Sequence, residues 1–261
     1  MIKKEKNGII YYEFEHLANT SLVNHCFSTR IGGVSKSPYN DMNLAYHMGD
    51  NPADVDENFR LISEVVGFNH QKIVMTDQNH KENHHVVTNT DKMEEPTDIL
   101  ISATPELVLT SYHADCVPIF YLDPVKKVIA NAHAGWRGTM ANVGHKTTIW
   151  MNRHFDCEFE DILIGIGPCI SIDHYEVDTD IVQRMKRFTP AADDCFIQKS
   201  AEKWHLDLAK INHQCFIAYG FPPENIQVAN LCTYANPDLF FSHRRDKEKR
   251  GNMSAMIALK Q

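Results

Sequence analysis

The sequence predicts an α/β protein: a single domain over residues 1–261 with a mixed β-sheet core layered with helices. Three observations lead to this prediction. Short apolar runs of strand length alternate with segments in which apolar residues recur at helical spacing. Two of the strongest strand candidates stand back to back around a turn in the middle of the chain. No internal repeat, low-complexity segment or long linker divides the 261 residues.

Strands are predicted where a short apolar run is bounded by turn residues. The central pair, 117–122 and 128–132, is joined by the turn signal Asp123-Pro124 and is expected to form a hairpin. The full set of predicted strands is 9–14, 25–28, 72–76, 84–88, 99–102, 107–111, 117–122, 128–132, 162–166, 226–229 and 256–259.

Helices are predicted from periodicity and from terminal residues. The helix that opens at Pro52 has the clearest signals, with Asn51 as N-cap and Gly67 as its end. Further helices are predicted over 138–153, 179–188 and 206–219. Three polar or charged segments, 30–35, 91–97 and 242–246, are predicted to be loops.

Composition excludes several classes of protein. The formal net charge of -8 argues against broad nucleic-acid binding, which needs a basic surface, although a local arginine cluster still permits an anionic small molecule. The N-terminal residues lack the apolar region of a signal peptide, and no run approaches the ~18 apolar residues of a membrane span. Seven scattered cysteines without a CxxC pair indicate free thiols in a reducing cytoplasm.

The main candidate for chemistry lies at the open end of the central hairpin. Cys116 directly precedes its first strand and His133 directly follows its second, so pairing of the strands brings the two side chains together. A thiolate and imidazoles suit Zn²⁺, and three protein ligands with one open position are typical of catalytic zinc. His80 follows strand 72–76 and is the candidate third ligand. A buried free cysteine with two ordinary histidines explains the same spacing.

A second hypothesis uses the same atoms. Cys116 can be a nucleophile activated by His133, as in cysteine hydrolases, with Asp115 orienting groups or carrying protons. A metal-bound thiolate is a poor nucleophile, so the two hypotheses exclude each other in any one state. The sequence does not separate them.

Arginines beside glycines are candidates for anion binding. Arg137 lies in Gly-Trp-Arg-Gly-Thr at the start of a predicted helix, where backbone N–H groups and a guanidinium both favour phosphate or carboxylate. Arg30 and the pair Arg244–Arg245 can converge on the same anion. Each of these arginines can equally be a solvated surface charge. Trp136 is expected in the core or in a pocket wall.

Several motifs together resemble a known family. They are Phe27-Ser-Thr-Arg30, Asn43-Leu44 with Gly49-Asp50, Asp77-Gln-Asn-His80, HADCVPI from His113, HAGWRGT from His133, Gly167-Pro168-Cys169 with Tyr175-Glu-Val177, and Phe241-Ser-His-Arg-Arg-Asp246. From about residue 20 to the C-terminus the chain resembles the laccase-domain proteins. These were catalogued as multicopper polyphenol oxidoreductases and are now described as zinc-containing purine nucleoside phosphorylases with adenosine deaminase activity.

The resemblance implies Zn²⁺ held by His80, Cys116 and His133. It implies phosphorolysis of adenosine, inosine, guanosine and methylthioadenosine, together with deamination of adenosine. Catalytic roles are expected for Cys116, His133 and Asp115. Binding of substrate or phosphate is expected for Arg30, Asn43, Gln78 and Arg137. Two positions depart from the family pattern: His113 stands where relatives usually carry a small residue, and Asn79 replaces a common valine.

Three alternatives stay beside this hypothesis. A cysteine hydrolase or amidase would use Cys116 and His133 on small peptides or cell-wall precursors. A polyphenol oxidase would need copper, but copper is the less suitable metal because the chain has no His-x-His pair of the kind that multicopper sites use. A non-catalytic module would bind metal or nucleoside without turnover. The oligomeric state cannot be predicted from the sequence.

Overall fold

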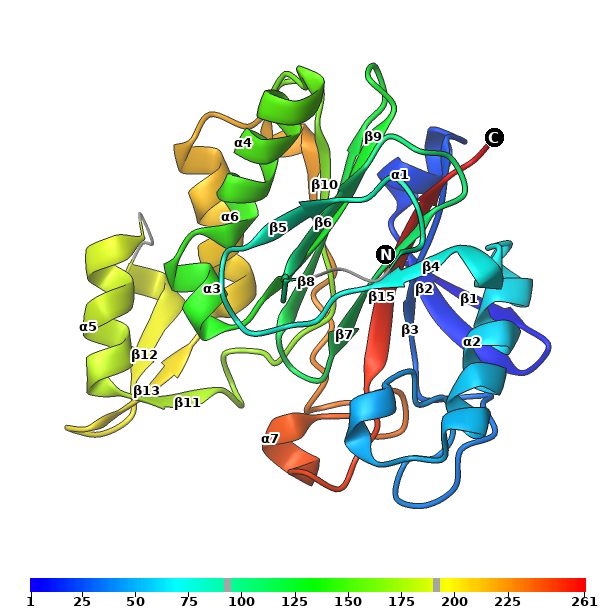
Figure 1. The fold of residues 1–261 in the computed structure, drawn as a ribbon. Helices are drawn as coiled ribbons and strands as arrows, with labels where there is room; N and C mark the ends of the chain where they lie inside the picture. The colour runs from blue at the N-terminus through cyan, green and yellow to red at the C-terminus, as the bar shows by residue number, and fades with distance from the viewer. Residues whose placement is uncertain (92–94, 190–192) are drawn as a thin grey trace.

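A computed structural model gives the fold of residues 1–91, 95–189 and 193–261. It contains two six-stranded sheets and one three-stranded sheet, with helices on the outside (Figure 1). The predicted α/β class with mixed sheets and helical layers is confirmed, although the strands divide among three sheets. That one domain extends over 1–261 stays a prediction.

The first sheet has the strand order β1-β2-β3-β15-β7-β4, and only β4 runs parallel to its neighbour. Its strands are β1 (Ile2–Lys6), β2 (Ile9–Glu13), β3 (Val23–Ser28), β4 (Ile73–Met75), β7 (Val108–His113) and β15 (Met253–Leu259). The C-terminal strand β15 lies between β3 and β7, so the sheet joins both ends of the sequence.

The second sheet has the order β14-β10-β8-β9-β6-β5 and carries the central hairpin. Its strands are β5 (His84–Val86), β6 (Ile99–Ser102), β8 (Val117–Asp123), β9 (Val128–Ala134), β10 (Leu163–Ile166) and β14 (Ile226–Val228). The predicted hairpin is confirmed, with β8 and β9 antiparallel along their whole length. A third, small sheet is formed by β11 (Glu176–Asp178), β13 (Lys203–Leu206) and β12 (Phe196–Gln198).

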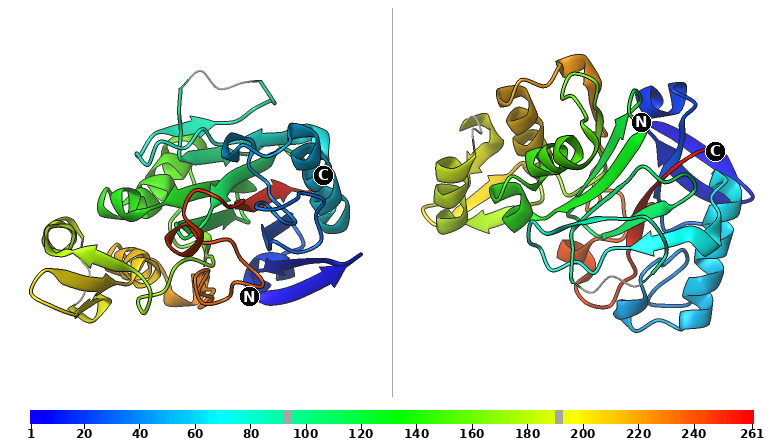
Figure 2. Two further views of the ribbon diagram at one scale, coloured as in Figure 1. Left: turned by 90° about the horizontal axis from the view of Figure 1, so that it is seen from below. Right: turned by 45° about the horizontal axis from the view of Figure 1, so that its top comes forward.

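The described ranges contain seven α-helices, which lie around the three sheets (Figure 1). They are α1 (Glu15–Asn19), α2 (Pro52–Val66), α3 (Trp136–Met140), α4 (Val143–Phe155), α5 (Thr179–Phe188), α6 (Leu208–Ala218) and α7 (His243–Asp246). Helix α2 packs on the first sheet, while α4 and α6 pack on the far side of the second (Figure 2). No helix in the described ranges combines the length and apolar character needed to cross a membrane.

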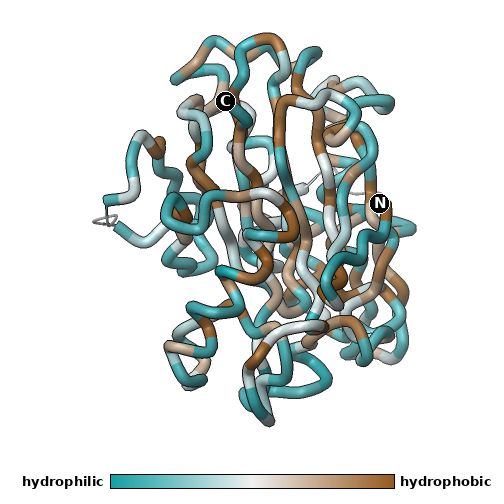
Figure 3. The backbone as a smooth tube through the Cα atoms, turned by 90° about the vertical axis from the view of Figure 1, so that its right-hand side faces the viewer, coloured by the Kyte–Doolittle hydropathy of each residue, from teal (hydrophilic) through white to brown (hydrophobic). Residues whose placement is uncertain are grey.

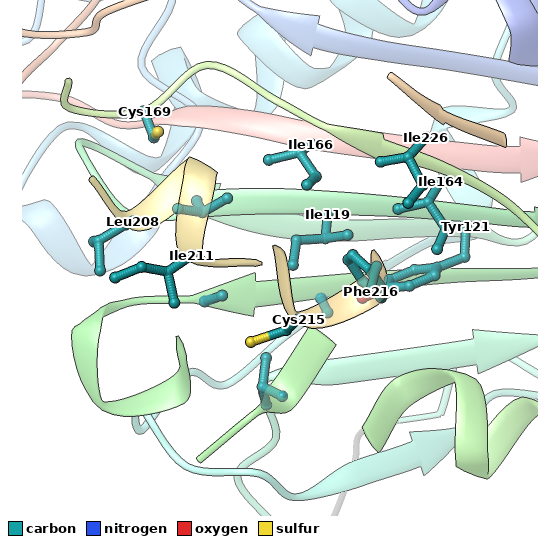
Figure 4. Packing of buried hydrophobic residues seen from close by; sticks show 14 of the residues in the cluster. Ile119, Tyr121, Ile164, Ile166, Cys169, Leu208, Ile211, Cys215, Phe216 and Ile226 are labelled. Carbon is teal, nitrogen blue, oxygen red and sulfur yellow. The ribbon is translucent and has the colours of Figure 1, made fainter. Parts of the chain in front are cut away.

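The hairpin is buried because both of its faces pack against protein. Along β8, Ile119 and Tyr121 face the core beneath α4 and α6, which Figure 4 shows from close by. The alternate residues Phe120 and Leu122 face the first sheet. A strand covered on both sides requires a continuous apolar run, which the sequence supplies. In Figure 3 the hydrophobic colour follows the interior strands and the hydrophilic colour follows the connecting loops.

Several predicted elements differ from the structure. Strand β15 begins at Met253, before the predicted start at 256, and Leu206, the predicted first residue of a helix, lies in β13. The single helix predicted over 138–153 is wrong: α3 and α4 are separate, because Asn142 adopts a left-handed backbone with φ 60° between them. The loop predicted over 242–246 is wrong, since Ser242 caps the short helix α7 by accepting the N–H of Arg245. Strand β9 extends past the predicted end at 132, so His133 lies within it. Of the loop predicted over 91–97, residues 92–94 lie outside the described ranges.

Candidate metal centre

The hairpin register sets two of the three predicted ligands beside each other. Pro118 pairs with His133 across the two strands, and Val117 pairs with Ala134. Cys116 is therefore one residue from the end of the paired region, next to the strand that carries His133. The chain turns into β8 through Asp115, whose φ of 92° is rare for a residue with a side chain.

The third predicted ligand comes from the loop between β4 and β5. His80 follows β4 and has a left-handed φ of 61°. Its ring stands edge-on to that of His133, with centroids 4.9 Å apart. One ligand atom from each of His80, Cys116 and His133 lies within 4.8 Å of the others. Among the His, Cys, Asp and Glu side chains of the described ranges, these three form a group that can hold a metal ion.

Cys116 and His133 perturb each other in the absence of metal. Burial alone would raise the pKa of Cys116, but the imidazole of His133 and hydrogen bonds from both histidines lower it to about 6. Burial alone would lower the pKa of His133, but the Cys116 sulfur and the carboxylate of Asp98 raise it to about 9. The metal-free pair is therefore a thiolate and an imidazolium at neutral pH.

Glycine leaves room for an ion between the side chains. A Cβ built on Gly135 would lie 3.1 Å from Sγ of Cys116 and 3.1 Å from Cδ2 of His80. Cysteine sulfur and histidine nitrogen are both common zinc ligands, and catalytic zinc sites use three protein ligands with a fourth position open. The residues present thus fit a soft divalent ion held by three protein ligands with a further position open.

A pocket of about 540 Å³ opens over these side chains. All three candidate ligands line it, together with Gln78 from the same loop as His80. A volume of this size is within the range of ordinary small-molecule sites. An open coordination position would therefore face a space large enough for a ligand.

Three of the four predicted substrate-binding residues lie outside this pocket, and two of them, Arg30 and Asn43, make contacts within loops. Arg30 does not line this pocket; its guanidinium donates to the main-chain carbonyls of Asn40 and Pro237 and packs over Phe241. Asn43 is fully buried, and its amide contacts Asp50 and the main chain of Ala45. Both residues hold loops together in this structure.

Of the other two, Gln78 lies in the pocket and Arg137 does not. Gln78 lines the pocket, but its amide is engaged: Oε1 accepts the N–H of Tyr112 at 2.7 Å and Nε2 donates to the carbonyl of Tyr112 at 3.0 Å. Arg137 is exposed, lies over the ring of Trp136 and is not among the lining residues.

Asp115 is buried beside Cys116 and both of its carboxylate oxygens accept hydrogen bonds. Oδ1 accepts from the hydroxyl of Thr233 at 2.6 Å. Oδ2 accepts from the hydroxyl of Ser242 at 3.0 Å and the N–H of Arg244 at 2.7 Å. The carboxylate therefore anchors the start of α7 next to the metal centre.

The sequence reasoning missed a cationic group in the pocket. Arg250, His47 and His243 line it, and Nη2 of Arg250 lies 3.3 Å from Nδ1 of His243. The buried Nε of Arg250 has no partner. Desolvation and the charge of Arg250 lower the pKa of His47 and of His243, so both imidazoles are neutral at neutral pH. Arg250 is the last residue of the basic segment that begins at Arg244. This segment is the sequence feature that could have indicated a cationic group.

His113, one of the two departures from the family pattern, is buried behind the centre. One ring nitrogen contacts the carbonyl of Cys116 at 3.1 Å, and the other contacts the hydroxyl of Ser111 at 2.7 Å. Burial lowers the pKa of His113 well below its usual value. The ring is therefore a neutral support for the turn that carries Cys116.

Comparison with known proteins identifies the family. A family model described as multi-copper polyphenol oxidoreductase laccase matches residues 24–260. The chain belongs to this family. Among similar proteins, purine nucleoside phosphorylase YlmD of Bacillus subtilis is 33% identical, over 90% of this chain and 88% of that protein. Purine nucleoside phosphorylase YfiH of Escherichia coli is 34% identical, over 90% of this chain and 93% of that protein.

Two similar solved structures have the same fold. YlmD from Geobacillus stearothermophilus superposes with a TM-score of 0.90 at 30% identity, covering 99% of this chain and 98% of that one. The protein called YfiH from Bacillus licheniformis gives a TM-score of 0.89 at 29% identity, covering 99% of both chains. The resemblance inferred from the motifs is confirmed, and the named relatives support a nucleoside phosphorylase family.

Proposed function

We propose that the protein is a zinc-dependent purine nucleoside phosphorylase, acting on adenosine, inosine, guanosine and methylthioadenosine, that also deaminates adenosine. The observation that carries this proposal is the convergence of His80, Cys116 and His133 at a pocket that also contains Arg250. The names of the relatives supply the substrate class. A cytoplasmic location remains a prediction.

His80, Cys116 and His133 would hold the zinc ion. When bound, Zn²⁺ supplies Lewis acidity and lowers the pKa of a coordinated water toward about 7. Cys116 acts as a ligand in this proposal, and its low pKa favours metal binding because the ligand must be deprotonated. Asp115 acts as a positioning residue, since both of its oxygens already accept hydrogen bonds.

We assign phosphate to Arg250 in place of Arg30 and Arg137. In phosphorolysis a phosphate oxygen bonds to C1′ of the ribose while the bond from C1′ to the purine nitrogen breaks, and the purine leaves with the electron pair. A guanidinium at the pocket wall orients the phosphate and offsets its charge. Arg250 has an unpartnered Nε and lines the pocket, whereas Arg30 and Arg137 do not line it.

The neutral imidazoles of His47 and His243 are the candidate proton carriers. Deamination adds water at C6 of adenine and releases ammonia, so a proton must move from the water to the leaving amine. Groups that are neutral at the working pH and lie within the pocket suit such transfers.

One observation favours a second candidate function. Without metal, Cys116 and His133 form the thiolate–imidazolium pair that cysteine hydrolases use. A chelator would leave that activity intact, whereas thiol alkylation would abolish it. The zinc enzyme is expected to lose activity on chelation and to regain it when Zn²⁺ is restored.

The central experiment combines metal analysis with product analysis. Purified protein is incubated with adenosine, with and without phosphate, and adenine, inosine and hypoxanthine are separated by chromatography. We expect phosphate-dependent release of adenine, phosphate-independent formation of inosine, and about one zinc per chain. Nucleoside binding without any product would leave a binding module, and product in the fully chelated protein would exclude the zinc enzyme.

The phosphate assignment is tested with two matched arginine variants. Arg250→Gln should raise the KM for phosphate roughly tenfold or more, because a charge-assisted hydrogen bond contributes about 1.5–3 kcal/mol. Arg137→Gln should leave that KM within about twofold. The reverse pattern would move the phosphate to Arg137.

A further inference from the structure

We propose that Asp98 is a positioning residue whose single carboxylate fixes two of the three side chains of the metal centre, His133 and His80, in their binding geometry. The proposal rests on the proposed metal site, but it concerns a residue outside the ligand set. Asp98 is fully buried and directly precedes β6, where no local sequence signal marks it.

The first oxygen orients His133. Oδ1 of Asp98 lies 2.7 Å from Nδ1 of His133, so the imidazole carries its proton on Nδ1 and directs Nε2 away from the carboxylate. The main chains of the two residues are also hydrogen-bonded, because the N–H of His133 donates to the carbonyl of Asp98 at 2.9 Å. Ring and backbone of His133 are therefore both fixed by one residue.

The second oxygen fixes the turn that carries His80. Oδ2 of Asp98 accepts the N–H of Asn79 at 3.1 Å and the N–H of Lys81 at 3.1 Å, so it binds the residues on both sides of His80. His80 itself has a left-handed backbone, which is unfavourable for a residue with a side chain. The carboxylate offsets this cost and holds the imidazole toward the hairpin.

No neutral amide of the same shape can perform both tasks. In Asp98→Asn one oxygen becomes an NH₂ donor. If that donor faces His133, it demands a lone pair on Nδ1 and moves the ring proton to Nε2, the atom needed for the metal. If it faces Asn79 and Lys81, three N–H donors oppose one another and the His80 turn loses its anchor. Either orientation should weaken metal binding.

The test measures metal affinity separately from turnover. Zinc affinity is determined by competition with a chromophoric chelator, and Co²⁺-substituted protein reports the thiolate and imidazole ligands through its visible spectrum. Asp98→Asn should lower the affinity about 10- to 100-fold and alter the Co²⁺ spectrum. If the unmodified protein binds no metal, the proposed function fails. If it binds metal and Asp98→Asn binds equally well with the same spectrum, only the role of Asp98 fails.

Asp123→Asn is the matched control. Asp123 is also a fully buried aspartate of this sheet, but it lies at the turn end of the hairpin, where Oδ1 accepts the N–H groups of Val125 and Lys126. The same change of carboxylate to amide there should leave zinc affinity within about twofold. An equal loss of affinity in both variants would show general destabilisation and overturn the specific role of Asp98.

If Asp98→Asn does not fold, the role of Asp98 can be tested on the unmodified protein. The amides of Asn79 and Lys81 should exchange with solvent slowly by NMR, both with and without Zn²⁺, because each donates to a buried carboxylate. The Nδ1 proton of His133 should likewise be observable in the zinc-loaded protein. Exchange of both amides as fast as that of the neighbouring Glu82, with no such Nδ1 proton, would overturn the proposal.

Discussion

The two ends of the β8–β9 hairpin are built from the same strands but depend on different parts of the chain. At the turn end, Asp123 accepts hydrogen bonds from residues two and three positions later, so the structure there is local. At the open end, Cys116 and His133 meet His80 from the β4–β5 loop, and Asp98 connects His133 to the His80 turn. Changes at the turn should therefore affect stability, and changes at the open end should affect metal binding.

The largest effect is expected from Cys116→Ala. Removing the sulfur ligand should abolish tight zinc binding and lower the rate of phosphorolysis by about 10³-fold, because the several kcal/mol supplied by the metal are lost. Cys215→Ala, a buried thiol of α6, is the control and should retain both zinc and activity. Full activity of Cys116→Ala would contradict the comparison and the proposed function.

The second-largest expected effect is the lowered pKa of the Cys116 thiol in the metal-free protein. Its pKa is lowered from the ordinary 9.0 to about 6, so the thiol is protonated below pH 6 and becomes a thiolate as the pH rises through that value. Ultraviolet absorbance of the thiolate, taken as the difference between unmodified protein and Cys116→Ala, measures the transition. A midpoint near pH 9 would mean that His133 and His80 do not reach the sulfur.

A pair of glycine variants sharpens the comparison within the open end. Gly135→Ala places a methyl group 3.1 Å from Cys116 and from His80, and overpacking of about 1–3 kcal/mol should lower zinc affinity roughly tenfold. Gly138→Ala, three residues later in α3, meets atoms no closer than 3.5 Å and should leave affinity unchanged. Titration of both variants with zinc measures the two affinities. Equal affinities would show that a methyl group at position 135 does not disturb the metal ligands.

The smallest effect is expected at the turn end. Asp123→Ala removes the acceptor for two N–H groups and should lower the free energy of unfolding by about 1–2 kcal/mol. Zinc affinity should stay within about twofold, since the open end keeps all of its contacts. Urea unfolding of the metal-free protein together with a zinc titration measures both. If the variant lost more free energy of zinc binding than free energy of unfolding, the claim that the turn end does not affect the metal centre would be contradicted.

Local signals predicted the parts of the fold that local interactions form. The cap at Asn51, the end of α2 at Gly67 and the β8–β9 hairpin follow from residues close together in sequence. The helix predicted over 138–153 fails because its apolar spacing continues through Asn142, whose left-handed backbone no periodicity reveals. The small sheet of β11, β13 and β12 was missed because its strands, EVD, KWHL and FIQ, contain charged or polar residues and form no continuous apolar run.

The arginines show the same limit in the candidate site. Arg30 and Arg137 both follow motifs that suggest anion binding, but burial and hydrogen bonding decide which arginine faces a pocket. In the folded chain Arg30 contacts carbonyls and Arg137 covers a tryptophan, while Arg250 lines the pocket. Orientation of this kind depends on loops that contact one another only after folding.

The sequence alone determined that Cys116 and His133 would meet, because the pairing of two adjacent strands needs only a turn between them. It also carried the motifs that identify the family. The tertiary structure decided that Asp98 would join His133 to His80 and that Arg250 would line the pocket. These contacts link segments that are far apart in the sequence, and the sequence separation does not reveal which of them come close together after folding.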